Sequence, residues 1–218
     1  MTIRAVIFDI GGVLYRTEDT TLHRQWEIRL GLSDGELTET VFTHPVAQEA
    51  LVGRATTEDL WRAVGSQLCL SPDELDALKE DFWAAGEWDD ELLAFARSLR
   101  PRVKTGIISD AWPDARQVVR AYVNERAFDV CVFSAEEGVR KPDPEIYRRA
   151  LRRLDVLPQE AVFVDDRLPN VSGARRMGMH GILFVSSDQV CKAIEAYLLD
   201  EQHSSSITSQ TEWGVCNE

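Results

Sequence analysis

The chain has 218 residues, which is enough for one well-buried core with an inserted accessory segment but short for two domains of ordinary size. Hydrophobic residues make up 44% and charged residues 28% of the chain, a globular composition that excludes wholesale disorder. The formal net charge of −13 repels polyanions, so we expect no nucleic-acid partner.

Five short apolar runs, rich in β-branched and aromatic residues, predict strands along the chain. They are Ile3–Phe8, Val103–Ile108, Phe128–Phe133, Ala161–Val164 and Ile182–Val185. These runs lack polar alternation, so each is expected to be buried on both faces, as in a parallel sheet covered by helices. Helix-like segments separate most of the runs. The pattern therefore predicts an α/β fold with a doubly wound, Rossmann-like parallel sheet.

About ninety residues between the first and second runs contain no convincing strand. The helices expected there are Thr21–Leu30, Glu36–Phe42, Val46–Leu51, Glu58–Leu68 and Pro72–Ala85. The last of them begins after Ser71, which can cap it, with Glu74 completing a capping box. A crossover between neighbouring parallel strands needs only a dozen or so residues. We therefore predict an all-helical cap at 16–88, inserted into an α/β core formed by 1–15 and 89–200.

The two ends of the chain carry different signals. The N-terminus enters an apolar run at once and lacks the pattern of a signal peptide. No stretch approaches the roughly 20 apolar residues of a membrane span, so we expect a cytoplasmic protein with no membrane partner. The four cysteines show neither metal-ligand spacing nor a disulfide framework. Residues 201–218 are too polar to pack and are predicted to form a disordered tail.

The residues that follow the strands are the first candidates for chemistry, because ligands bind beyond the carboxyl ends of the strands in an open parallel sheet. The polar residues at these ends are Asp9, Ser109, Asp110, Asp165 and Asp166. Singly, a strand-end aspartate is as often a turn former or a helix cap. Carboxylates that converge on one edge repel one another, however, and a hard divalent cation is the ordinary remedy. Few protein ligands, completed by water and substrate, favour magnesium over calcium.

Two further groups suit an anionic ligand at this edge. Lys141 directly precedes a helix that Asp143 caps and Pro144 opens, and its ammonium group can neutralise a phosphoryl oxygen. Ser109 offers a hydroxyl group and nearby backbone N–H groups. The strand ends and Lys141 together predict a site for a small phosphorylated molecule.

The order and spacing of these residues resemble the four signature motifs of the haloacid dehalogenase (HAD) superfamily, over roughly residues 3–185. The resemblance implies a magnesium-dependent phosphatase of small metabolites, sugar phosphates among them, in which Asp9 forms an aspartyl-phosphate. It implies that Mg²⁺ is held by Asp9, the backbone carbonyl of Gly11, Asp165 and Asp166. It also implies that the phosphoryl group is held by Ser109, Asp110 and Lys141.

Two positions depart from the family pattern. Phosphatases of the superfamily commonly carry a second aspartate, a general acid and base, where this chain has Gly11, and Asp110 stands where asparagine is frequent. One alternative is therefore a weak or inactive member that binds a phosphorylated ligand without useful turnover. A third interpretation is hydrolysis of a carbon–halogen bond. The Asp165–Asp166 pair argues against it, because that reaction needs no metal.

Two residues outside the motifs are weaker candidates for substrate contact. Arg54 precedes a predicted helix and resembles a cap position that often reaches toward substrate, although a solvated surface arginine explains it equally well. Trp112 closely follows the second motif and could wall the pocket, but a packing role is the favoured interpretation.

Overall fold

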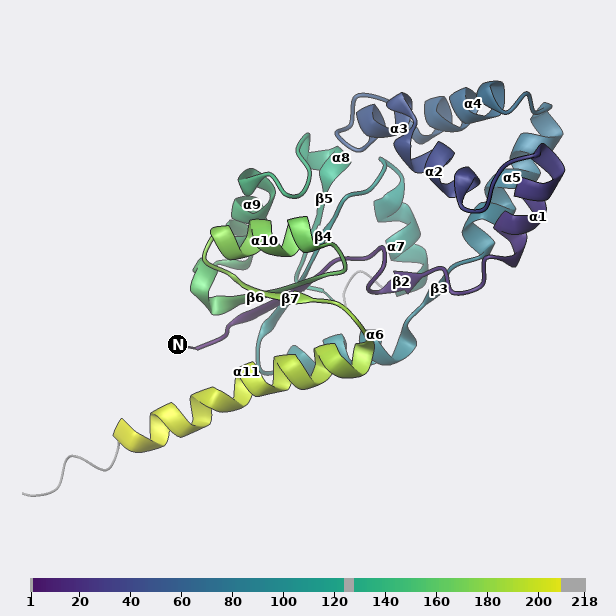
Figure 1. The fold of residues 1–218 in the computed structure, drawn as a ribbon. Helices are drawn as coiled ribbons and strands as arrows, with labels where there is room; N and C mark the ends of the chain where they lie inside the picture. The colour runs from purple at the N-terminus through teal and green to yellow at the C-terminus, as the bar shows by residue number, and fades with distance from the viewer. Residues whose placement is uncertain (1, 124–127, 209–218) are drawn as a thin grey trace, which may run out of the picture.

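A five-stranded parallel sheet forms the centre of the protein, between two layers of helices (Figure 1). The computed structural model describes residues 2–123 and 128–208, and only the backbone over 200–208. The sheet has the order β5-β4-β1-β6-β7, and every pairing in it is parallel. Its strands are β1 (Ala5–Phe8), β4 (Lys104–Ser109), β5 (Val130–Phe133), β6 (Ala161–Asp165) and β7 (His180–Leu183). The α/β fold expected from the sequence is confirmed.

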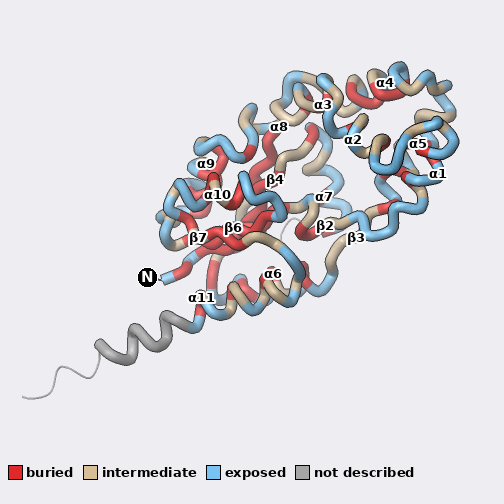
Figure 2. Tube along the Cα trace, viewed as in Figure 1, coloured by how far each residue is buried: buried red, intermediate tan, exposed pale blue. Residues whose placement is uncertain are grey.

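Side chains of the central strand β1 alternate between two apolar layers. Val6 and Phe8 pack in one layer, and Ala5 and Ile7 pack in the other, because successive residues of a strand face opposite sides of the sheet. The first layer is covered by α6 (Asp90–Leu99), α7 (Ala115–Val123) and α11 (Ser187–Thr208). The second is covered by α9 (Pro144–Leu154) and α10 (Leu168–Arg176). Both layers are needed, since all four residues of β1 are buried. Figure 2 shows that the neighbouring strands β4 and β6 are likewise mostly buried.

Of the helices between β1 and β4, five lie within residues 16–88, the range for which the sequence predicts a cap (Figure 1). They are α1 (Thr21–Leu30), α2 (Glu36–Thr43), α3 (Pro45–Ala50), α4 (Thr57–Gln67) and α5 (Pro72–Ala84). The capping box expected at Ser71 and Glu74 is present. Two short antiparallel strands, β2 (Tyr15–Arg16) and β3 (Glu87–Trp88), pair where this segment leaves and rejoins the core. We call residues 17–86 the helical insert; its role as a cap stays a prediction.

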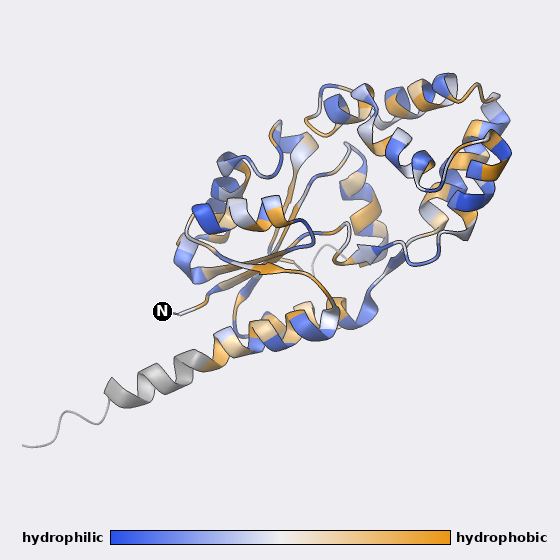
Figure 3. Cartoon of the chain, in the orientation of Figure 1, coloured by the Kyte–Doolittle hydropathy of each residue, from blue (hydrophilic) through white to orange (hydrophobic). Residues whose placement is uncertain are grey.

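The helical insert has an apolar cluster of its own, which includes Trp26, Trp61 and Phe82. Figure 3 shows hydrophobic and hydrophilic stretches alternating along the helices of the insert, as expected where one face of each helix packs on this cluster. Trp26 and Trp61 are both buried in this cluster. Trp83, by contrast, is 42% exposed. One indole ring of this region is therefore left partly open.

The C-terminal region differs from the sequence prediction over part of its length. Helix α11 continues through residues 201–208, which polarity predicted to be disordered. A helix that is already formed gains one hydrogen bond for each residue added, so polar residues can extend a helix that they would not nucleate. The rest of the predicted tail, 209–218, lies outside the described residues. Among the described residues, no helix combines the length and the apolar character needed to cross a bilayer.

Candidate active site

A buried ion cluster lies at the carboxyl edge of the sheet, with Lys141 at its centre. Nζ of Lys141 lies 2.7 Å from Oδ2 of Asp9 and 2.8 Å from Oδ2 of Asp165. The same ammonium group donates to the backbone carbonyl of Ile108 over 3.3 Å. Because β4, β1 and β6 are neighbours in the sheet, their ends bring Ile108, Asp9 and Asp165 to one place. Three of the groups that the sequence singled out are thus in direct contact.

Negative charge exceeds positive charge in this cluster. Burial raises the pKa of Asp9 to about 7, because attraction to Lys141 offsets only part of the desolvation and Asp165 adds repulsion. Burial also raises the pKa of Asp110, and partial desolvation together with repulsion by Asp165 raises that of Asp166. Burial alone would lower the pKa of Lys141, but the surrounding carboxylates outweigh it and raise that pKa. Lys141 pairs with Asp9 and Asp165 and also attracts the carboxyl groups of Asp110 and Asp166. A further cation would therefore stabilise the cluster.

Asp165 and Asp166 are adjacent in sequence but differ in their surroundings. Asp165 is fully buried, and its oxygens accept hydrogen bonds from Lys141, from the side-chain amide of Asn170 and from the backbone N–H of Arg167. Asp166 is exposed. The carboxylate of Asp165 is therefore already occupied in holding Lys141, whereas that of Asp166 is open to a ligand.

The donor atoms at this edge fit a hard cation. Asp9, Asp165 and Asp166 each offer a carboxylate oxygen, and the three oxygens lie within 4.8 Å of one another. Gly12 adopts a φ of +76°, and a Cβ atom there would stand 2.3 Å from Oδ2 of Asp166. Only glycine therefore leaves the space that the Asp166 carboxylate fills. Clustered carboxylate oxygens are the ligands that magnesium and calcium prefer.

The loop after β4 is tied to the loop that carries Lys141. Ser109 ends β4 and is buried, and the next residue, Asp110, accepts a hydrogen bond from the backbone N–H of Lys141 over 2.9 Å. An asparagine oxygen could accept the same bond, which explains how a carboxylate fits at this position. Ser134 was missed by the sequence analysis: its hydroxyl accepts a hydrogen bond from the backbone N–H of Ala111 at 2.9 Å. Ser134 directly follows β5, so the strand-end rule could have found it.

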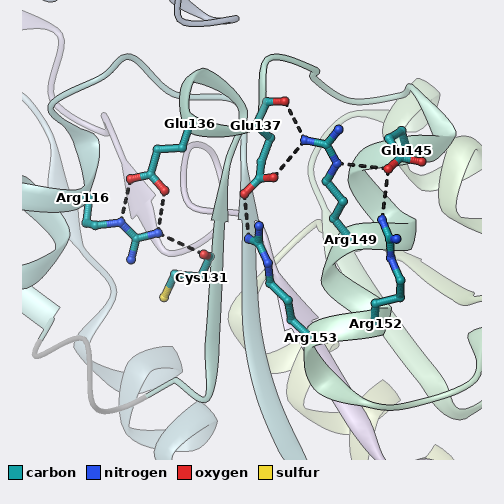
Figure 4. A network of polar contacts seen from close by, with 8 residues as sticks. All are labelled: Arg116, Cys131, Glu136, Glu137, Glu145, Arg149, Arg152 and Arg153. Atoms are coloured by element: carbon teal, nitrogen blue, oxygen red, sulfur yellow. Dashed lines mark hydrogen bonds and ion pairs between the residues drawn. The ribbon is translucent and has the colours of Figure 1, made fainter.

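Ion pairs connect the two helices that flank the loop of Lys141; Figure 4 shows these pairs. Glu137, the last residue of α8 (Ser134–Glu137), pairs with Arg149 over 3.0 Å and with Arg153 over 2.6 Å. Both arginines lie on α9, whose first turn is capped by Asp143. The side chain of Glu137 is only 7% exposed, so solvent screens these pairs less than surface pairs. The loop over 138–143 is therefore held between two anchored helices.

The two weaker candidates contact groups outside the ion cluster. The guanidinium group of Arg54 pairs with Glu49 of the helical insert, and its side chain is 68% exposed. The structure thus pairs Arg54 with a surface carboxylate of its own segment instead of a group of the cluster. Trp112 is buried and belongs to the apolar cluster of the helical insert, which supports the packing interpretation. Its ring stacks on that of Phe42, with centroids 5.5 Å apart.

With the site described, comparison with known proteins shows the family. Residues 3–178 match the family of haloacid dehalogenase-like hydrolases. The chain therefore belongs to this family and is a hydrolase. It is 29% identical to the sesquiterpene phosphatase astK of Aspergillus oryzae, over 87% of this chain and 94% of the relative. It is 31% identical to a phosphorylated carbohydrates phosphatase of Thermotoga maritima, over 83% of this chain and 84% of the relative.

Other relatives are longer than this chain. The bifunctional epoxide hydrolase 2 of Sus scrofa is 29% identical over 89% of the chain, which spans only 39% of that protein.

Solved structures share the fold. A HAD family enzyme of Bacteroides thetaiotaomicron, in complex with magnesium and inorganic phosphate, has a TM-score of 0.68 and 19% identity, covering 83% of this chain and 93% of that one. The L-2-haloacid dehalogenase of Xanthobacter autotrophicus has a TM-score of 0.61 and 25% identity, covering 86% and 80%.

Proposed function

We propose that this hydrolase is a magnesium-dependent phosphatase of small phosphorylated metabolites, sugar phosphates among them. The observation that carries the proposal is the charge imbalance at the sheet edge, where four carboxyl groups share one buried lysine. A phosphate ester could not approach such a site unless a further cation offset its charge. A dehalogenase of this family would not need that cation. The exposed carboxylate of Asp166 therefore favours phosphate chemistry.

In this proposal Asp9 is the nucleophile. A carboxylate oxygen of Asp9 attacks phosphorus, the bond from phosphorus to the ester oxygen breaks, and the alcohol leaves with a proton taken from water. A second water molecule then attacks the phosphorus of the aspartyl-phosphate, and the bond from phosphorus to the Asp9 oxygen breaks. Inorganic phosphate leaves, the Asp9 carboxylate is restored, and the proton released by this water neutralises the hydroxide left by the first step. Lys141 lies against Asp9, holds it in place and screens it from Asp165. The backbone after Ser109 and the Lys141 ammonium group would hold the phosphoryl oxygens.

The groups proposed to hold magnesium are Asp9, the backbone carbonyl of Gly11, Asp166 and, directly or through water, Asp165. Magnesium bound there would offset the excess negative charge and polarise a phosphoryl oxygen. The names of two relatives support phosphatase chemistry, one acting on a sesquiterpene and one on phosphorylated carbohydrates. The Bacteroides neighbour, which contains magnesium and phosphate, supports the choice of metal and ligand.

The test is phosphate release from acetyl phosphate and p-nitrophenyl phosphate by the purified chain, with magnesium and with excess chelator. We expect turnover that requires magnesium, and its loss in Asp9→Asn, a variant that keeps the folded circular dichroism spectrum because the amide is nearly isosteric. Halide release from 2-haloacids in the presence of chelator would favour the dehalogenase interpretation. Phosphate binding without turnover by the parent would favour the binding protein.

A further inference from the structure

Trp83 connects the two loops that carry the candidate site. It lies near the end of α5, and its backbone carbonyl accepts a hydrogen bond from the hydroxyl group of Tyr15, four residues after Gly11. Its ring also meets that of Trp112 edge to face, with centroids 5.7 Å apart, and Trp112 lies three residues after Ser109. The helical insert therefore touches both site loops through the same aromatic residue.

Two rings of this region are partly open to solvent. Phe42 is 44% exposed and Trp83 is 42% exposed, and both contact the buried ring of Trp112. We call Phe42, Trp83 and Trp112 the aromatic triad. Large aromatic side chains of a folded protein usually bury most of their area, because they carry the most hydrophobic surface per residue. Two partly open rings that both contact Trp112, in the loop after β4, are therefore a surface that an apolar group would cover.

Trp112 supplies a second, independent sign that a ligand completes this region. Among the described residues, its Nε1 is a buried donor with no hydrogen-bond partner. Buried indole N–H groups normally find an acceptor, because leaving one unpaired costs the hydrogen bond that it made to water. An oxygen atom of a bound phosphate ester could accept this bond.

The direction of the reaction relates the triad to the leaving group. In a phosphoryl transfer the attacking and leaving oxygens lie roughly in line through phosphorus. With Asp9 at the sheet edge, the leaving group points away from the sheet, and the elements beyond that edge belong to the helical insert (Figure 1). The organic part of the substrate is thereby directed toward the insert and its triad.

On the basis of the phosphatase function proposed above, we infer that the preferred substrates are monophosphate esters of apolar alcohols. The hydrocarbon part packs against the open rings of Phe42 and Trp83, beside Trp112. A polyhydroxylated leaving group would gain less there, because aromatic rings offer its hydroxyl groups no acceptors beyond their π faces. This inference selects one chemical class among the small metabolites that the proposed function covers.

The experiment compares n-alkyl monophosphates from ethyl to octyl with glucose 6-phosphate, measuring phosphate release at saturating magnesium. These are all esters of primary alcohols, which limits differences in leaving-group basicity. Full burial of a methylene group corresponds to about fourfold in binding, so contact on one side predicts about twofold in kcat/KM for each added methylene. We expect octyl phosphate to exceed glucose 6-phosphate at least tenfold. A flat series, or a preference for the sugar ester, would overturn the inference.

Variants locate the effect on the triad. Phe42→Ser and Trp83→Ser should flatten the dependence on chain length, whereas Trp83→Phe should keep most of it. Tyr122→Ser, which removes a 71% exposed ring on α7 outside the triad, should leave the slope as in the parent. An unchanged slope in both triad variants would also overturn the inference. Acetyl phosphate separates the two proposals: if the parent fails to hydrolyse it, the phosphatase function is wrong, and if it succeeds with a flat alkyl series, only the substrate class is wrong.

Discussion

The ammonium group of Lys141 lies 2.7 Å from a carboxylate oxygen of Asp9, and both side chains are almost completely buried. Breaking such a pair by removing one partner strands the other charge in the protein interior. We expect Lys141→Met to lower the free energy of unfolding by about 3–5 kcal/mol in the absence of magnesium. Urea unfolding at pH 7.5, followed by circular dichroism, measures this change.

The matched control is Lys192→Met. Lys192 pairs with Asp188, but both side chains are about three-quarters exposed, so its removal should change the free energy of unfolding by less than about 0.5 kcal/mol. If Lys141→Met has the same free energy of unfolding as Lys192→Met, the buried ion pairs of Lys141 do not stabilise the fold and the prediction is wrong.

Magnesium binding should depend on pH. The pKa of Asp9 rises to about 7 in the metal-free protein, and a metal ligand has to be deprotonated, so binding should release protons below that pH. We expect the magnesium affinity to increase by up to about tenfold per pH unit below pH 7 and to level off above it. At a hundredfold excess over its dissociation constant, magnesium should add about 2.7 kcal/mol to the free energy of unfolding. Isothermal titration calorimetry in buffers of different ionisation enthalpy would report both the affinity and the protons released.

The stability of the metal-free protein should change in the opposite direction with pH. Because the pKa of Asp9 is higher in the folded than in the unfolded chain, its protonation stabilises the fold at low pH, and this contribution is lost as pH rises through about 7. The slope from this group is about 1.4 kcal/mol per pH unit between its two pKa values. Asp9→Asn should show a shallower decline from pH 5 to pH 8 in chelator. An equal decline in the parent and in Asp9→Asn would assign the effect to other groups.

The ion pairs of Glu137, which connect the two helices flanking the loop of Lys141, give a prediction about activity. Glu137→Gln removes the charge that Arg149 and Arg153 share, and it should cost about 1–2 kcal/mol of stability, since hydrogen bonds to a charged group are lost. We also expect kcat to fall, because the loop over 138–143 loses an anchor. Arg152→Gln is the control: this arginine is 71% exposed, and it pairs with Glu145 on its own helix. The prediction is wrong if both variants keep the parent kcat.

The strand ends are the part of the site that the sequence predicts well. Asp9 directly follows β1 and Asp165 ends β6, and parallel pairing of these two buried strands places their ends together regardless of what lies between them in the chain. Helix starts in the insert are similarly local: Ser71 and Pro72 determine where α5 begins. The core strands and these caps depend on neighbours in sequence, which is why they can be derived without a structure.

Other features depend on tertiary contacts and could not be predicted. Strand β7 begins at His180, two residues before the apolar run, because its extent is set by pairing of His180 with Val162. Glu137 pairs with Arg149 and Arg153 because of how α8 and α9 pack against each other. Sequence spacing and composition do not indicate which of the chain's arginines pair with this glutamate. For Arg54, the structure shows a pair with Glu49 that its position before a helix did not predict. Its proposed contact with substrate therefore lacks structural support.

Gly11 stands where a general acid and base is expected from the family resemblance, and the structure leaves room for a Cβ atom at this position. A Cβ atom added at Gly11 would meet no heavy atom within 4 Å, and its backbone is not in the left-handed region. At Gly12, by contrast, the φ of +76° and the carboxylate of Asp166 leave no room. Gly11→Asp should therefore fold, whereas Gly12→Asp should be destabilised and lose affinity for magnesium.

An enzyme without a positioned proton donor relies on leaving groups that depart as anions with little help. We expect the rate of the parent to fall steeply as the pKa of the leaving alcohol rises, so that acyl and aryl phosphates react faster than alkyl phosphates of similar size. Adding a general acid is typically worth 10²- to 10⁴-fold in rate, so Gly11→Asp should accelerate alkyl esters most and flatten the dependence. Measuring kcat for one series of esters with both proteins tests this.

The alternative is that Asp110 donates the proton, and Asp110→Asn tests it. The amide oxygen of asparagine can still accept the hydrogen bond from the backbone N–H of Lys141, but asparagine has no carboxyl proton to donate. Should the parent show a flat dependence that turns steep in Asp110→Asn, the proton donor is Asp110, and Gly11 does not limit catalysis.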